Sequence, residues 1–140
     1  MNLSVRVILR FVAIAALFCT SNCLHGQYER IQLRVYGLDC ELCARGVAAS
    51  VHRLSGVKSV DVNLKKGMLE IVLIPGNSFK MSDLRKRIRD NGFRPMDARV
   101  TAVGRFSGTK FEVLGSGDSY EAKEPDAKAS TPVERTFDVH

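Results

Sequence analysis

Two cysteines, Cys40 and Cys43, are the residues of this chain whose types and spacing are best suited to chemistry. A Cys-x-x-Cys pair can hold a soft metal ion or close a reversible disulfide, and in both roles the thiolate is the active form. The pair follows a strand-like run, in a glycine-containing segment, and precedes a helix-like run. Thiols at a helix start feel the positive end of the helix dipole, so we expect both to ionise easily.

The pair supplies two sulfur ligands, whereas a closed structural zinc site needs four ligands. We therefore expect an open site that can pass its cargo on. The other metal-ligand candidates are weaker. His52 lies about 13 Å beyond Cys43 along the predicted helix, at 1.5 Å per residue, and is interpreted as a surface residue. The remaining histidines are near the ends of the chain, and the methionines are interpreted as packing residues: His25, His140, Met68, Met81 and Met96.

Six elements are predicted around the pair. Alternation of polar and apolar residues indicates strands, and apolar residues at i, i+4 and i+7 indicate a helix. Glycines mark the ends of several elements, and Ser82 is a candidate cap for the second helix. In order they are a strand at 30–36, a helix at 44–54, strands at 57–64 and 68–74, a helix from Ser82 to Gly92, and a strand at 96–103. This β-α-β-β-α-β order predicts an α+β fold with two helices on a four-stranded antiparallel sheet, the ferredoxin-like arrangement.

The first segment of the chain carries the marks of a signal peptide. Arg6 and Arg10 precede or flank an apolar run at 11–18, and small and polar residues follow it. The run is shorter than the roughly 20 residues of a spanning helix. We expect cleavage near residues 21–26, and hence a periplasmic or secreted protein; a retained membrane anchor is the alternative. The predicted organisation is a signal peptide at 1–26, a domain at 27–103, a β-hairpin extension at 104–120 and a disordered tail at 121–140.

Charge is unevenly distributed in the chain. Residues 27–99 hold 14 basic and 8 acidic side chains, whereas residues 100–140 hold 5 basic and 7 acidic ones. The basic stretch is either a solvated helix face or a surface that steers the domain to an acidic partner. We expect no nucleic-acid partner for an exported chain, and Phe93 is the only aromatic residue among these charges that could stack on a base. The stretch comprises Lys80, Arg85, Lys86, Arg87, Arg89, Arg94 and Arg99.

Three motifs together resemble the heavy-metal-associated domain, a small βαββαβ module of soft-metal chaperones, periplasmic mercury-binding proteins and metal-pumping P-type ATPases. They are Gly37-x-x-Cys40-x-x-Cys43, Leu54-x-Gly56-Val57-x-x-Val60-x-Val62 and Asp90-x-Gly92-Phe93. The resemblance covers residues 30–103. It implies that Cys40 and Cys43 coordinate the metal, and that Phe93 packs beside the loop and shields it.

Two positions depart from the usual family pattern. Leu38 replaces the methionine that plugs the core beneath the loop, a swap of similar volume that should pack. Asp39 stands immediately before the first cysteine, as in the domains of zinc-, cadmium- and lead-exporting pumps. Copper(I) and mercury(II) are satisfied by two thiolates, whereas zinc, cadmium and lead gain from a further oxygen ligand. Asp39 is therefore either a third ligand or, like Glu41, a negative charge at a helix start.

The expected function is to bind a heavy-metal ion, namely copper(I), zinc, cadmium or mercury(II), through Cys40, Cys43 and Asp39. The protein would carry or sequester the ion outside the cytoplasm and deliver it to a metal-transporting P-type ATPase or another membrane transporter. It is expected to act as a monomer and not as an enzyme, since no serine-histidine-acid set, phosphate loop or paired carboxylates are present. The alternatives are an exported thiol-disulfide oxidoreductase and an accessory or sensor subunit of a metal pump.

Overall fold

The computed structural model describes residues 27–121 and 133–139. The predicted signal peptide at 1–26 lies outside the described residues. Two α-helices and seven strands are present in the described part, with one short 3₁₀ helix, η1 (Leu64–Lys66). The helices are α2 (Glu41–His52) and α3 (Met81–Asp90); the strands are β1 (Tyr28–Tyr36), β2 (Val57–Asn63), β3 (Met68–Leu73), β4 (Arg94–Ser107), β5 (Lys110–Val113), β6 (Ser119–Glu121) and β7 (Val133–Val139).

The strands form one antiparallel sheet with β1 at its centre. The order is β2-β3-β1-β4-β5-β6, and β7 also pairs with β4. Ile31 of β1 lies opposite Ile71 of β3 on one side and Val100 of β4 on the other. Strand β1 is therefore paired on both sides, by β3 and β4, and it fixes the start of the loop that follows Tyr36.

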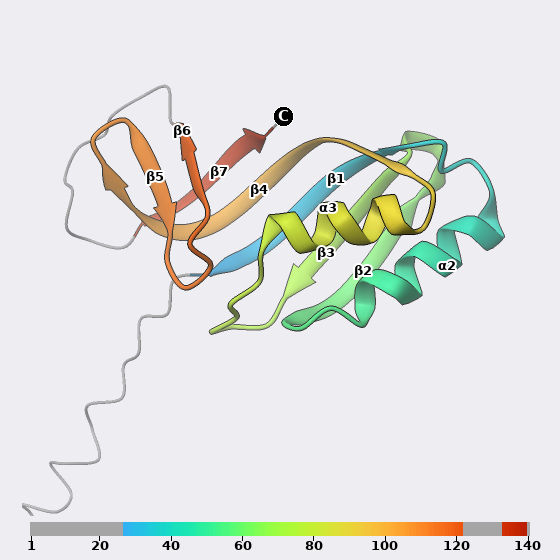
Figure 1. The fold of residues 1–140 in the computed structure, drawn as a ribbon, viewed down its shortest axis with the longest axis horizontal. Helices are drawn as coiled ribbons and strands as arrows, with labels where there is room; N and C mark the ends of the chain where they lie inside the picture. The colour runs from blue at the N-terminus through green and yellow to red at the C-terminus, as the bar shows by residue number, and fades with distance from the viewer. Residues whose placement is uncertain (1–26, 122–132, 140) are drawn as a thin grey trace, which may run out of the picture.

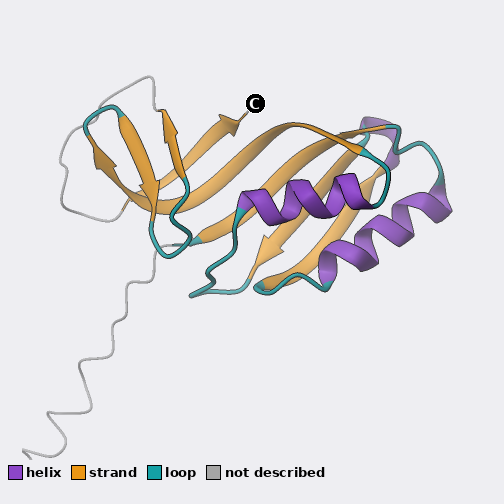
Figure 2. Cartoon of the chain, in the orientation of Figure 1, coloured by secondary structure: helices purple, strands orange, loops and turns teal. Residues whose placement is uncertain are grey.

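Both helices cover the same face of the sheet, as Figures 1 and 2 show. Helix α2 buries Ala44, Val47 and Val51, and α3 buries Met81, Leu84 and Ile88. These side chains pack onto alternate strand residues that have almost no exposed surface, such as Ile31, Leu33, Ile71 and Val100. The predicted ferredoxin-like arrangement of two helices on an antiparallel sheet is confirmed.

Some predicted boundaries differ from the structure. Helix α2 begins three residues earlier than predicted, at Glu41, so that it starts inside the cysteine motif. Helix α3 begins at Met81, with Lys80 and not Ser82 at its N-cap position. Ser82 lies inside the first turn of α3 and is exposed. The prediction of Ser82 as the cap was therefore wrong.

The C-terminal part of the chain is more ordered than predicted. Strand β4 continues to Ser107 and pairs with β5, which is the predicted hairpin extension, and β6 adds a further strand. The predicted disordered tail at 121–140 is wrong for residues 133–139, which form β7 along β4 from Ala98 to Gly104. This pairing satisfies backbone groups that an edge strand would leave free. Residues 122–132 and 140 lie outside the described part.

No helix in the described part of the chain is long and apolar enough to cross a membrane.

Candidate metal centre

The two cysteines lie where β1 ends and α2 begins, at the end of the molecule away from β5 and β6 (Figure 1). Cys40 is the N-cap residue of α2, with extended backbone angles of φ −108° and ψ 129°. Its Sγ accepts a hydrogen bond from the backbone N of Cys43 at 3.4 Å, and its carbonyl accepts one from Ala44 N at 2.9 Å. A thiol thus takes the place that a serine or aspartate side chain usually takes in a helix cap.

Both thiols are free and accessible: Cys40 is exposed and Cys43 is half-buried. Hydrogen bonds from the Cys43 thiol and backbone lower the pKa of Cys40 below its usual value. The hydrogen bond that the Cys43 thiol donates to Cys40 holds the proton on Cys43 and so raises the pKa of Cys43. The prediction that both thiols ionise easily therefore holds for Cys40 only, because the first thiolate opposes a second one beside it.

A buried leucine and a phenylalanine support the loop. Leu38 is 3% exposed and belongs to the core, as predicted for the residue beneath the loop. Gly37 has a positive φ of 83°, a conformation that suits glycine. A Cβ placed on Gly37 would lie 3.9 Å from the Phe93 ring, so Phe93 packs beside the loop as the resemblance implied.

The two acidic residues of the motif have different surroundings. Glu41 forms an ion pair with Arg45 at 2.6 Å, one helical turn away, which supports a structural interpretation of Glu41. Asp39 is exposed, and its negative charge opposes ionisation of both thiols, although the hydrogen bonds from Cys43 still lower the pKa of Cys40. No group of three or more histidine, cysteine or acidic side chains is placed to hold a metal ion within residues 27–121 and 133–139. Asp39 as a ligand stays a prediction.

The remaining candidate ligands do not approach the pair. His52 is exposed in the last turn of α2, as expected of a surface residue. His25 and His140 lie outside the described residues. The basic stretch is partly engaged within the molecule: Lys86 pairs with Asp90 at 2.6 Å and Arg99 with Asp138 at 3.1 Å.

Sequence reasoning did not identify an apolar rim around the loop. Tyr36 is 72% exposed and Leu42, between the cysteines, is 79% exposed. Leu64 and Met96 are also exposed, and they line a hollow of about 520 Å³ together with Tyr36 and Asp39. Of these residues, only Tyr36 stands at a position that the strand alternation assigns to solvent, whereas Leu64 and Met96 share the alternation of the core-facing residues. Met96, interpreted as a packing residue, is instead 38% exposed.

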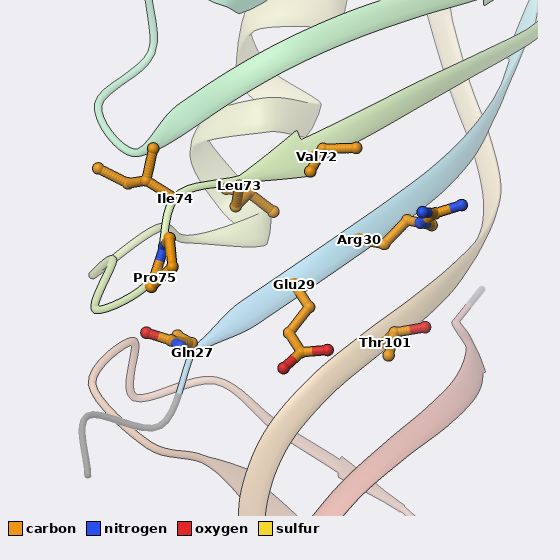
Figure 3. Close-up of a pocket in the computed structure, with 8 residues that line it drawn as sticks. All are labelled: Gln27, Glu29, Arg30, Val72, Leu73, Ile74, Pro75 and Thr101. Carbon is orange, nitrogen blue, oxygen red and sulfur yellow. The ribbon is translucent and has the colours of Figure 1, made fainter.

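Another hollow, of about 560 Å³, lies away from the cysteines on the face of the sheet opposite the helices (Figure 3). Its lining contains no cysteine, histidine or methionine, so it offers a soft metal ion no preferred ligand. The lining residues are Gln27, Glu29, Arg30, Val72, Leu73, Ile74, Pro75 and Thr101.

The part of the chain that carries the two cysteines is similar to known proteins. A sequence model of the heavy-metal-associated domain matches residues 32–94, which include both cysteines and Phe93. The chain is 34% identical over 65 residues to the copper chaperone CopZ of Bacillus subtilis (strain 168), covering 46% of this chain and 93% of CopZ. It is 30% identical over 84 residues to the copper-transporting ATPase RAN1 of Arabidopsis thaliana, covering 56% of this chain and 8% of RAN1.

Two solved domains also match part of this chain. A copper binding domain from HMA7, a P-type ATPase, is 29% identical with a TM-score of 0.45, covering 49% of this chain and 90% of that domain. A CopZ metallochaperone is 27% identical with a TM-score of 0.45, covering 48% of this chain and 98% of that protein. Because the match with Bacillus CopZ takes in nearly all of that relative, the chain belongs to the heavy-metal-associated domain family.

Proposed function

We propose that this protein binds a soft heavy-metal ion between Cys40 and Cys43 and carries or sequesters it outside the cytoplasm, for delivery to a membrane transporter. The observation that carries the proposal is the accessible pair of free thiols at the start of α2. Two sulfur ligands on an exposed helix start leave positions around the metal that a partner's ligands can occupy. Such a site suits transfer of an ion better than permanent storage.

Copper(I) is the first ion to test. It is satisfied by two thiolates, and the two curated relatives are a copper chaperone and a copper-transporting ATPase. Asp39 argues for a divalent ion instead, because its negative charge opposes formation of two thiolates and a divalent ion offsets that charge better. Zinc, cadmium and mercury(II) are therefore alternatives that the same titration separates.

The proposed partner is a metal-transporting P-type ATPase or another transporter, and the proposed state is a monomer. The apolar rim of Tyr36, Leu42, Leu64 and Met96 surrounds the loop on which a receiving protein would have to close. Export rests on the sequence of residues 1–26, with their short apolar run after two arginines.

A thiol-disulfide oxidoreductase is the second candidate. The lowered pKa of an accessible Cys40 favours it, because a reactive thiolate is what such enzymes use. Metal binding is the better-supported function, since the match with the copper chaperone takes in 93% of that protein, whereas the match with the copper-transporting ATPase takes in only 8%.

One experiment separates the two candidates. The reduced protein is titrated with copper(I) against a competing chelator, and is also assayed for reduction of a test disulfide. A carrier binds one ion per Cys40–Cys43 pair and shows no turnover. Catalytic turnover of the disulfide with weak or non-stoichiometric copper binding would contradict the proposal.

A further inference from the structure

Helix α3 begins without a cap from its own sequence. Its N-cap residue, Lys80, forms no side-chain hydrogen bond to the helix, because an ammonium group has no acceptor. The first N–H groups of a helix need acceptors from elsewhere. The structure provides one from far along the chain: Asp118 Oδ2 accepts from Met81 N at 3.0 Å. This carboxylate also suits the positive end of the helix dipole.

The same carboxylate holds the first strand. Asp118 Oδ2 accepts a hydrogen bond from the Tyr28 hydroxyl at 2.5 Å, and that hydroxyl also lies 2.5 Å from the Tyr120 hydroxyl. Tyr28 has no exposed surface. Asp118 is itself fixed, since its N–H donates to Ser116 Oγ at 3.1 Å and its carbonyl accepts from Val113 N at 2.9 Å. One side chain thus joins β1, α3 and the β5–β6 turn.

The segment that carries Asp118 is packed into the core as well. Phe111 is fully buried and Val113 is 2% exposed, in the same cluster as Ile31 and Leu84. The Phe106 and Phe111 rings meet edge to face at 5.2 Å. At Gly104 the hairpin approaches so closely that a Cβ would lie 2.3 Å from the Glu112 carbonyl oxygen and 2.6 Å from the Phe111 ring.

We propose that residues 104–121 form a strap that holds α3 onto the sheet, with Asp118 as its attachment point, and that the domain unfolds cooperatively only together with this strap. The cooperative unit of this chain then includes residues 104–121, although the family match ends at residue 94. Through α3, the strap is also connected to the metal loop. This helix leads through Gly92 into Phe93, which packs beside Gly37.

The proposal is tested by hydrogen exchange of the full-length protein. The amides followed are Val113 N in the strap and Leu33 N in β1. Asp118→Asn removes the charge that caps α3, and Asp118→Ala removes the acceptor altogether. Ser119→Ala is the matched control, because Ser119 is exposed beside Asp118. In a cooperative unit, exchange of both amides accelerates by the same factor, about tenfold for Asp118→Ala and less for Asp118→Asn, while Ser119→Ala leaves both rates unchanged.

A second substitution tests the strap without touching the carboxylate. Gly104→Ala forces the hairpin away from β4, whereas Gly46→Ala is the control in α2, where an added Cβ meets nothing within 4 Å. Gly104→Ala should accelerate exchange of both amides together, as the Asp118 variants do. Acceleration at Val113 alone in either set, with Leu33 unchanged, would overturn the proposal and make the strap a separately folding appendage. If Asp118→Ala does not fold, the milder Asp118→Asn decides by the same comparison.

Discussion

Replacing Leu38 with alanine tests how firmly the metal loop is anchored. The Leu38 side chain is 3% exposed and packs in the core two residues before Cys40. Leucine-to-alanine changes at buried sites cost about 2–5 kcal/mol, from lost burial together with the cavity that remains. Because Leu38 lies in a loop whose backbone can partly relax, we expect a loss near the lower middle of that range, about 3 kcal/mol.

Leu42 supplies the matched control four residues later. It is the same residue type in the same motif, but 79% of it is exposed. Surface substitutions of this kind usually change stability by less than about 0.5 kcal/mol. Comparing the two variants therefore separates the stability lost with a buried side chain from any general sensitivity of the loop to substitution.

Urea unfolding of the metal-free, reduced protein measures both variants. With a slope of about 1–1.5 kcal/mol per molar urea for a domain of this size, Leu38→Ala should lower the midpoint by about 2–3 M. Leu42→Ala should move it by less than about 0.5 M. Equal shifts for the two variants would refute the conclusion that Leu38 anchors the loop in the core.

Three further predictions concern the site and the exported state. If Asp39 is a ligand, Asp39→Ala weakens zinc or cadmium binding more than tenfold, about 1.4 kcal/mol, while copper(I) binding holds or improves; equal losses for both ions in chelator-competition titrations would exclude the ligand role. Because the pKa of Cys40 is lowered and that of Cys43 raised, iodoacetamide at neutral pH should modify Cys40 first, and peptide mapping that finds Cys43 first would contradict the geometry. Residues 1–30 fused to a reporter that works only outside the cytoplasm should give activity, and the mature N-terminus should lie between Asn22 and Gln27; a mature chain beginning at Met1 would point to an anchored protein.

Most of the central fold could be predicted from local sequence patterns. The alternation around Ile31 and Leu33 and the helical spacing of Val47 and Val51 report burial on one face directly, and both pairs are buried as expected. The position of the cysteine pair was equally local, because a glycine turn separates strand and helix there. What these patterns could not provide is any contact between distant segments.

The cap of α3 shows this limit. Ser82 was the best local candidate, yet the acceptor at the helix start is Asp118, 37 residues from Met81 in the chain. The prediction of a disordered tail at 121–140 was wrong for a different reason. Its polar composition suggested disorder, although Val133, Phe137 and Val139 alternate with polar residues, which is a strand pattern that composition obscured. The uneven pKa values of the two thiols also depended on geometry, since they arise from one sulfur bonding to the other.

The central claim, that Cys40 and Cys43 hold one metal ion, is tested most directly by copper(I) stoichiometry in the double variant Cys40→Ser/Cys43→Ser. Ser119→Ala serves as the control, because it changes an exposed residue of β6 outside the site. The reduced wild-type and control proteins should bind one copper(I) ion with high affinity, and the double variant should bind none while retaining the wild-type circular dichroism spectrum. A folded double variant that still binds one ion with unchanged affinity would contradict the account.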